Sequence, residues 1–100
     1  MYIAMNRFRI APGMEGEFIE IWKTRDTHLE SVPGFKEFHL LQGSSDETCT
    51  KFISHSIWKS ATDFENWTRS DAFRKAHANA GSSKDIYLGP PQFDGYEIVL

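Results

Sequence analysis

Three separated residues in this chain of 100 residues have the chemistry of a ligand-binding site, and Asn6 is the first. It interrupts an apolar strand pattern in which Ala4 and Phe8 share its face. Asparagine is disfavoured in strands, and a buried amide without a partner costs about 1–3 kcal/mol. The pattern leaves three interpretations open: an amide bonded within the core, an exposed amide, and a donor aimed into a pocket.

His77 and Trp67 are the other two. His77 follows Phe73 by one helical turn, where an imidazole is favoured by the helix dipole or can bind a metal ion or haem iron. Trp67 pairs with Phe64 at helical spacing, which is also typical of core packing. On one straight helix Trp67 and His77 would lie about 15 Å apart along the axis. The cap signal at Ser70 predicts a break that could bring both to one cleft.

Other common sites are absent from the sequence. It has no glycine-rich phosphate loop, no Cys/His set with zinc spacing and no Gly-x-Ser-x-Gly turn. Cys49 is the single cysteine, so no internal disulfide forms. With no secretory signal at the N-terminus, we expect a reducing, cytoplasmic location.

The elements that must position these residues follow the order β-α-β-β-α-β. Alternation and turn signals predict strands at 2–10, 35–43, 49–58 and 92–100. Helical spacing and caps predict helices at 14–30, 61–67 and 71–79. This order is the ferredoxin-like plan of an α+β fold, and we expect one domain spanning residues 1–100.

The amino-acid composition limits the classes of binding partner that we expect for this chain. The chain carries 11 basic and 14 acidic residues, a formal net charge of −3, which argues against a nucleic-acid footprint. No apolar run reaches the roughly 18 residues of a membrane helix. Aromatic residues make up 14% of the chain, more than a small core needs. Because the predicted strands are apolar on both faces, we expect a homodimer whose sheets face one another.

A family resemblance connects these residues. The chain resembles the IsdG-type haem-degrading monooxygenases, within the wider antibiotic biosynthesis monooxygenase family of dimeric α+β barrels. The resemblance spans residues 1–80 with nearly collinear spacing. The matching residues are Met5–Asn6–Arg7, Pro33–Gly34–Phe35, Ile57–Trp58–Lys59–Ser60, Phe64, Trp67, Ser70–Asp71, Phe73 and Ala76–His77.

The resemblance implies a role for each site residue. His77 would be the axial ligand of the haem iron, and Asn6 would donate a hydrogen bond on the opposite side, where dioxygen binds. Trp67 would press on the porphyrin and distort it, while Phe64 and Phe73 would line the haem slot. Haem would be both substrate and cofactor, opened with O2 to release iron and a bilin-type tetrapyrrole. Electrons would come from an external reductase or small reductant.

Three alternatives stay open at this point. One is a cofactor-free monooxygenase of the same fold that acts on a quinol or polyketide. Another is a non-catalytic haem-binding protein, and the third is an interaction dimer without a site. Charge alone makes four residues candidates for contact with the haem propionates: Arg7, Arg74, Lys75 and Lys84.

Overall fold

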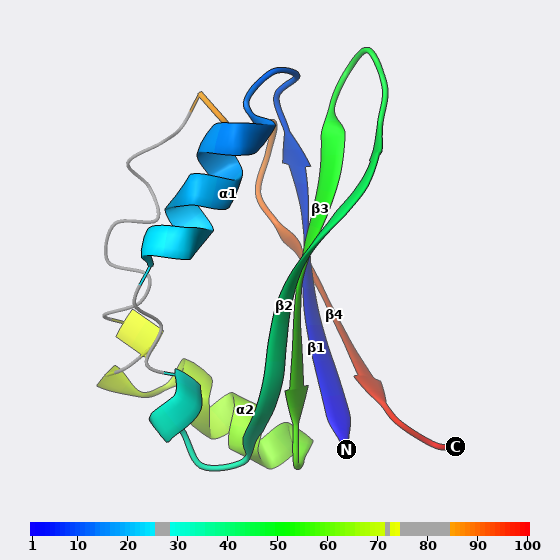
Figure 1. Cartoon of the computed structure of the whole chain (residues 1–100). Helices are drawn as coiled ribbons and strands as arrows, with labels where there is room; N and C mark the ends of the chain where they lie inside the picture. Colours follow the sequence, from blue (N-terminus) through cyan, green and yellow to red (C-terminus); the bar gives the residue numbers. More distant parts are fainter. Residues whose placement is uncertain (26–28, 72, 75–84) are drawn as a thin grey trace.

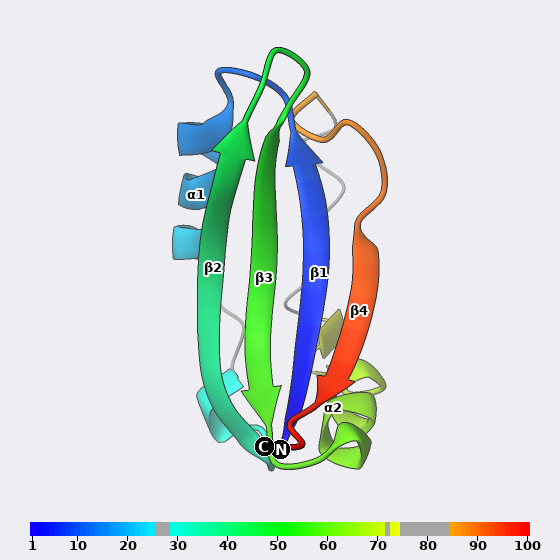
Figure 2. The same cartoon turned by 90° about the vertical axis from the view of Figure 1, so that its right-hand side faces the viewer.

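The protein is a four-stranded antiparallel sheet, and the helices that the structure describes all lie on one face (Figure 1). A computed structural model describes residues 1–25, 29–71, 73–74 and 85–100. The strands are β1 (Tyr2–Ile10), β2 (Phe35–Ser45), β3 (Thr50–Trp58) and β4 (Gln92–Glu97). The helices are α1 (Glu15–Thr24) and α2 (Ala61–Thr68), with a 3-10 turn η1 (Leu29–Ser31). The sheet order β2-β3-β1-β4 (Figure 2) confirms the predicted ferredoxin-like fold.

Three predicted boundaries are wrong by two residues or more. The strand expected over 35–43 extends to Ser45. The helix expected over 14–30 ends at Thr24, because Arg25 takes an extended conformation with φ −73° and ψ 123°. The strand expected over 92–100 ends at Glu97, which pairs with Tyr2. Since β1 begins at Tyr2, the strand pairing ends there, and one further backbone hydrogen bond follows, from the N–H of Ile98 to the carbonyl of Met1 at 2.8 Å.

The register of the central strands decides which side chains lie under the helices. In β1, Ala4, Asn6 and Phe8 point to the helix-covered face. Asn6 pairs across the ladders with Ser54 on β3 and with Phe93 on β4. The predicted face of the first strand is therefore confirmed, and the amide lies on the same side as the helices.

The core is divided into two clusters. One contains Ile10, Phe18, Phe52 and Ile86, under α1. The other contains Ala4, Leu29 and Trp58, near η1 and α2. Partly buried aromatic side chains pack against each cluster, and members of both groups line the space described below.

The helical segment after β3 is broken, as the sequence predicts. Ser60 caps α2, since its hydroxyl accepts the N–H of Asp63 at 3.1 Å. The hydroxyl of Ser70 donates to the carbonyl of Trp67 at 2.6 Å and accepts the N–H of Phe73 at 3.2 Å. Ser70 thus ends the segment that contains α2 and caps the helical turn that follows it. The remainder of the segment predicted over 71–79 lies outside the described residues beyond residue 74.

Asp46 organises the β2–β3 loop and gives a prediction for acid stability. Its carboxylate accepts the N–H groups of Thr48 at 2.7 Å and Cys49 at 2.9 Å, and the Thr48 hydroxyl. These hydrogen bonds lower the pKa of Asp46 from 3.8 to about 2. A depressed pKa contributes stability that is present above pH 4 and is lost as the pH falls towards 2. We expect the difference in urea midpoint between the wild type and Asp46→Ala to shrink over this range. A difference in urea midpoint that stayed constant over this pH range would contradict the stabilising role of the Asp46 carboxylate.

The opposite face of the sheet carries none of the described helices (Figure 1). Ile3, Ile57 and Tyr96 form a cross-strand apolar row there, and Tyr96 is 54% exposed. Arg7 and Asp94 form an ion pair on this face at 3.0 Å. No helix in the described part of the chain is long and apolar enough to cross a membrane.

Candidate functional site

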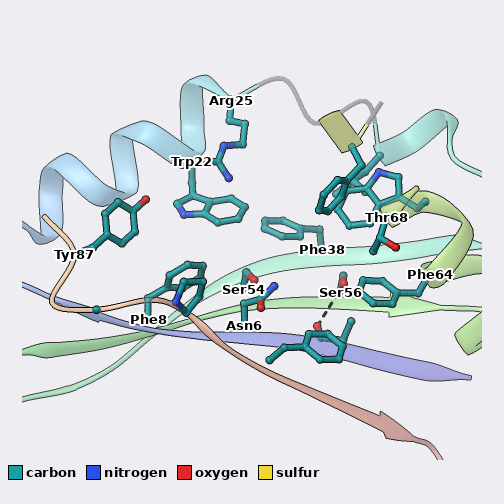
Figure 3. Close-up of a pocket in the computed structure, with 17 residues that line it drawn as sticks. Asn6, Phe8, Trp22, Arg25, Phe38, Ser54, Ser56, Phe64, Thr68 and Tyr87 are labelled. Atoms are coloured by element: carbon teal, nitrogen blue, oxygen red, sulfur yellow. Dashed lines mark hydrogen bonds between the residues drawn. The ribbon is translucent and has the colours of Figure 1, made fainter. Parts of the chain in front are cut away.

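A cavity of about 530 Å³ lies between the sheet and the helices, at the gap between the two core clusters (Figure 3). Its floor consists of small side chains on β1 and β3: Ala4, Ser54 and Ser56, together with Asn6. Large residues at these four central positions would fill the space with core. The sequence therefore creates the cavity by leaving the middle of the sheet with little side-chain volume.

The walls are mainly aromatic. Trp22 stacks on Phe38, with ring centroids 5.4 Å apart and an interplanar angle of 21°. Phe64 of α2 stacks on Phe93 of β4, at 5.4 Å and 6°. Such a lining suits a large, flat, apolar ligand, and the volume falls within the roughly 300–1,000 Å³ of small-molecule sites. The aromatic residues that line the cavity are Phe8, Trp22, Phe38, Phe64, Trp67, Phe73, Tyr87 and Phe93.

Trp67 is held on two sides. Its ring centroid lies 5.3 Å from that of the fully buried Trp58 and 4.8 Å from that of Phe73, which meets it edge-on. The Ser70 break makes the second contact possible, because it turns the chain after α2 and returns Phe73 to the cavity. The indole therefore has little freedom to move away from the cavity.

The polar groups of the floor differ in their partners. The hydroxyl of Ser56 accepts the indole N–H of Trp58 at 2.9 Å and donates to the carbonyl of Ala4 at 3.4 Å. Within the described part of the chain, the side chains of Asn6 and Ser54 make no hydrogen bond. The structure thus excludes a core amide satisfied by described neighbours, and places the carboxamide at the cavity, on its sheet side (Figure 3).

Arg25 is the basic residue among the described lining residues. Its guanidinium carbon lies 4.4 Å from the centroid of the Trp22 ring, a cation–π contact. Burial lowers the pKa of Arg25, and the nearby Tyr87 partly offsets this effect. Arginine stays protonated under all ordinary conditions, so this wall presents a positive charge to a mostly apolar cavity.

Arg25 was not among the basic residues singled out from the sequence. Of those, Arg7 lies on the other face of the sheet in its ion pair with Asp94, and Arg74 pairs with Asp71. Lys75 and Lys84 lie outside the described residues. The sequence feature that could have indicated Arg25 is its position three residues after Trp22. Whether the two side chains meet, however, depends on where α1 ends.

The structure brings together four of the five site residues predicted from the sequence. Asn6, Phe64, Trp67 and Phe73 line this one cavity. His77 lies outside the described residues. Among the residues that are described, no group of three or more His, Cys, Asp or Glu side chains is arranged to hold a metal ion.

Comparison with known proteins agrees with the fold. Residues 1–79 match the family model "Antibiotic biosynthesis monooxygenase". A Staphylococcus epidermidis protein named "Heme oxygenase (staphylobilin-producing)" is 31% identical over 85 residues, which are 85% of this chain and 81% of that protein.

Two solved structures share the fold. The heme-degrader MhuD of Mycobacterium tuberculosis, with two hemes bound in its active site, has a TM-score of 0.76 at 24% identity, covering 100% of this chain and 97% of its own. An anthrone oxidase-like protein has a TM-score of 0.78 at 24% identity, covering 99% of this chain and 44% of its own. The match to the family model covers most of the chain, and the chain therefore belongs to the antibiotic biosynthesis monooxygenase family.

Proposed function

We propose that the protein is a haem-degrading monooxygenase that opens haem with O2 and external electrons. The observation that carries the proposal is the cavity itself: flat aromatic walls, one cationic wall residue and an unbonded carboxamide on the floor. The 31% identity to a named haem oxygenase supports the same substrate and a linear tetrapyrrole product. Haem, when bound, supplies the iron that activates dioxygen and the ring that is oxidised.

The residues of this chain would divide the work of binding and positioning. Phe64, Phe93 and the opposing Trp22–Phe38 stack would bury the porphyrin faces and exclude water. Trp67, fixed by Trp58 and Phe73, would press on the macrocycle and favour a nonplanar shape. These contacts are apolar, so they would bind the ring without competing for its polar groups.

The polar groups would set its orientation. The Asn6 carboxamide would donate a hydrogen bond to dioxygen in the cavity without supplying an acidic proton. The Arg25 guanidinium would pair with a propionate, a contact that is strong because both groups are charged and partly desolvated. His77 would be the axial ligand of the iron, as the family resemblance implies.

A haem titration tests the proposal. Hemin added to the purified protein is expected to give a saturable Soret shift, and addition of a reductant in air is expected to bleach it. His77→Ala is expected to change the spectrum of the ferric complex, because a neutral imidazole would be lost from the iron. Analysis of the released pigment by mass spectrometry would identify the bilin.

The outcomes separate the alternatives. Absence of a Soret shift would show that the protein does not bind haem. This result would favour the alternative of a cofactor-free monooxygenase that oxidises a quinol or polyketide. A Soret band that stays stable under reductant and air would identify a haem-binding protein without activity. An unchanged ferric spectrum in His77→Ala would refute the ligand assignment.

We further propose that the face without helices is covered by a second copy of the chain. Its apolar row of Ile3, Ile57 and Tyr96 would be buried in this way. Tyr96→Glu is expected to weaken self-association by roughly tenfold or more, because a charge would be placed in the interface. Sedimentation velocity measures this change, with Tyr96→Phe as the control. A monomer at all concentrations in the wild type would overturn the proposal.

The proposed activity also needs a source of electrons and a suitable cellular compartment. We propose an external reductase or small reductant as electron donor, and a reducing, cytoplasmic compartment. The buried free Cys49 is in keeping with such a compartment.

A further inference from the structure

The floor of the cavity holds three polar side chains, and two of them, Asn6 and Ser54, make no hydrogen bond in the described part of the chain. Asn6 and Ser54 are direct cross-strand partners on β1 and β3. Directly opposed residues place their Cβ atoms about 4.5–5.5 Å apart on the same face. Figure 3 shows the carboxamide and the hydroxyl next to each other, beneath the Trp22–Phe38 stack. Ser54 is only 7% exposed, so bulk water does not solvate its hydroxyl freely.

Ser54 makes no hydrogen bond to Asn6, and its other neighbours in the described part of the chain do not bond to it either. Across the other ladder it faces the hydrocarbon side chain of Leu40. Along β3 its same-face neighbours are the Phe52 ring and the Ser56 hydroxyl, and the latter already bonds Trp58 and Ala4. In the described part of the chain the Ser54 hydroxyl therefore makes no hydrogen bond and borders the cavity, where a ligand could accept its proton.

We propose that Ser54 is a second hydrogen-bond donor to dioxygen in the cavity, acting beside Asn6. The inference rests on the proposed haem-degrading function and names a residue that positions its oxidant. An oxygen atom accepts two hydrogen bonds at once, and two donors on adjacent strands would hold it in one orientation above the ring. Because both strands are central in the sheet, this orientation is fixed by the backbone register and not by a loop.

Carbon monoxide is a suitable probe, because it binds reduced haem iron and its stretching frequency responds to nearby donors. A donor beside the oxygen lowers the C–O stretching frequency, so removal of the donor raises it. We expect Ser54→Ala to raise the frequency. Thr and Val have nearly the same shape, and only Thr carries a hydroxyl. Ser54→Thr should therefore keep the wild-type frequency, whereas Ser54→Val should raise it.

A second reading gives Ser54 an indirect role, in which its hydroxyl only orients the Asn6 carboxamide. The double variant separates the two. If Ser54 donates directly, Ser54→Ala raises the frequency further in an Asn6→Ala background. If the effect of Ser54→Ala disappears in that background, Ser54 acts through Asn6 and the proposal is overturned.

Fluoride affinity gives an independent readout. Fluoride binds ferric haem as a pure acceptor, and loss of one hydrogen bond should weaken it roughly two- to tenfold in Ser54→Ala. Ser45→Ala is the control, since this exposed hydroxyl at the end of β2 lies outside the cavity lining and its loss should leave both readouts unchanged. Haem-loaded protein in which Ser54→Ala changes neither readout would refute the role of Ser54 alone. Absence of a Soret shift in the wild type would instead refute the proposed function, and this inference with it.

Discussion

Replacing Asn6 with alanine is expected to leave haem binding nearly intact and to slow haem breakdown roughly 100-fold, the usual cost of removing one preorganised donor. The side chain borders the cavity but contributes little to its aromatic walls, so the binding surface survives. The floor loses the carboxamide that would contact dioxygen. Single-turnover decay of the Soret band under reductant and air measures the rate, and a hemin titration measures binding.

Asn6→Asp is the matched control. It keeps the size and shape of the side chain but replaces the N–H donor with an acceptor. We expect its rate to fall at least as far as that of Asn6→Ala, because the carboxylate would repel electron density on oxygen. Wild-type rates in both variants would show that the amide has no part in the reaction. A large loss of haem affinity in Asn6→Ala would instead make the residue a binding group.

Trp58→Ala is expected to destabilise the fold by about 3–5 kcal/mol, the cost of truncating a large buried ring. Trp58 is fully buried and contacts Phe35, Phe64 and Trp67. Native domains have only about 5–15 kcal/mol of stability, so a large share would be lost. Urea denaturation followed by circular dichroism measures the change.

Trp58→Phe separates packing from hydrogen bonding. It keeps a ring but removes the indole N–H that donates to Ser56. We expect a smaller loss, about 1–2 kcal/mol, since part of the volume and one hydrogen bond disappear. Because Trp67 rests on Trp58, the alanine variant should also weaken haem binding more than its stability alone explains. Equal stability of the two variants would contradict this account of the packing.

The sequence was sufficient to locate the four strands, though not the ends of β2 and β4, because period-2 alternation and the Pro33–Gly34 turn are local signals. It was also sufficient for the break at Ser70, where a serine after Trp67 is a local cap. The end of α1 was missed, because the conformation of Arg25 reflects its packing on Trp22 and no helix-stop residue occurs before Pro33.

In the site, too, residues with a local sequence signal could be predicted, whereas residues placed by long-range pairing could not. Asn6 stood out because its type conflicts with its strand. Ser54 and Ser56 did not, because serine is unremarkable in a strand until the β1–β3 register shows which residues it faces. Tyr87 and Gly89 reach the cavity through the isolated bridge from Ile10 to Tyr87, a long-range pairing that no local pattern indicates.

One wall of the cavity belongs to an edge strand. β4 pairs with β1 alone, and Phe93 leans from it onto Phe64. Residues on this strand can change without repacking Ile10, Phe18 or Phe52, which lie in a separate cluster. Substitutions at Phe93 would therefore reach the Trp58 cluster only through Phe64 and would leave the cluster under α1 in place, which makes this edge the natural starting point for directed evolution towards other flat ligands.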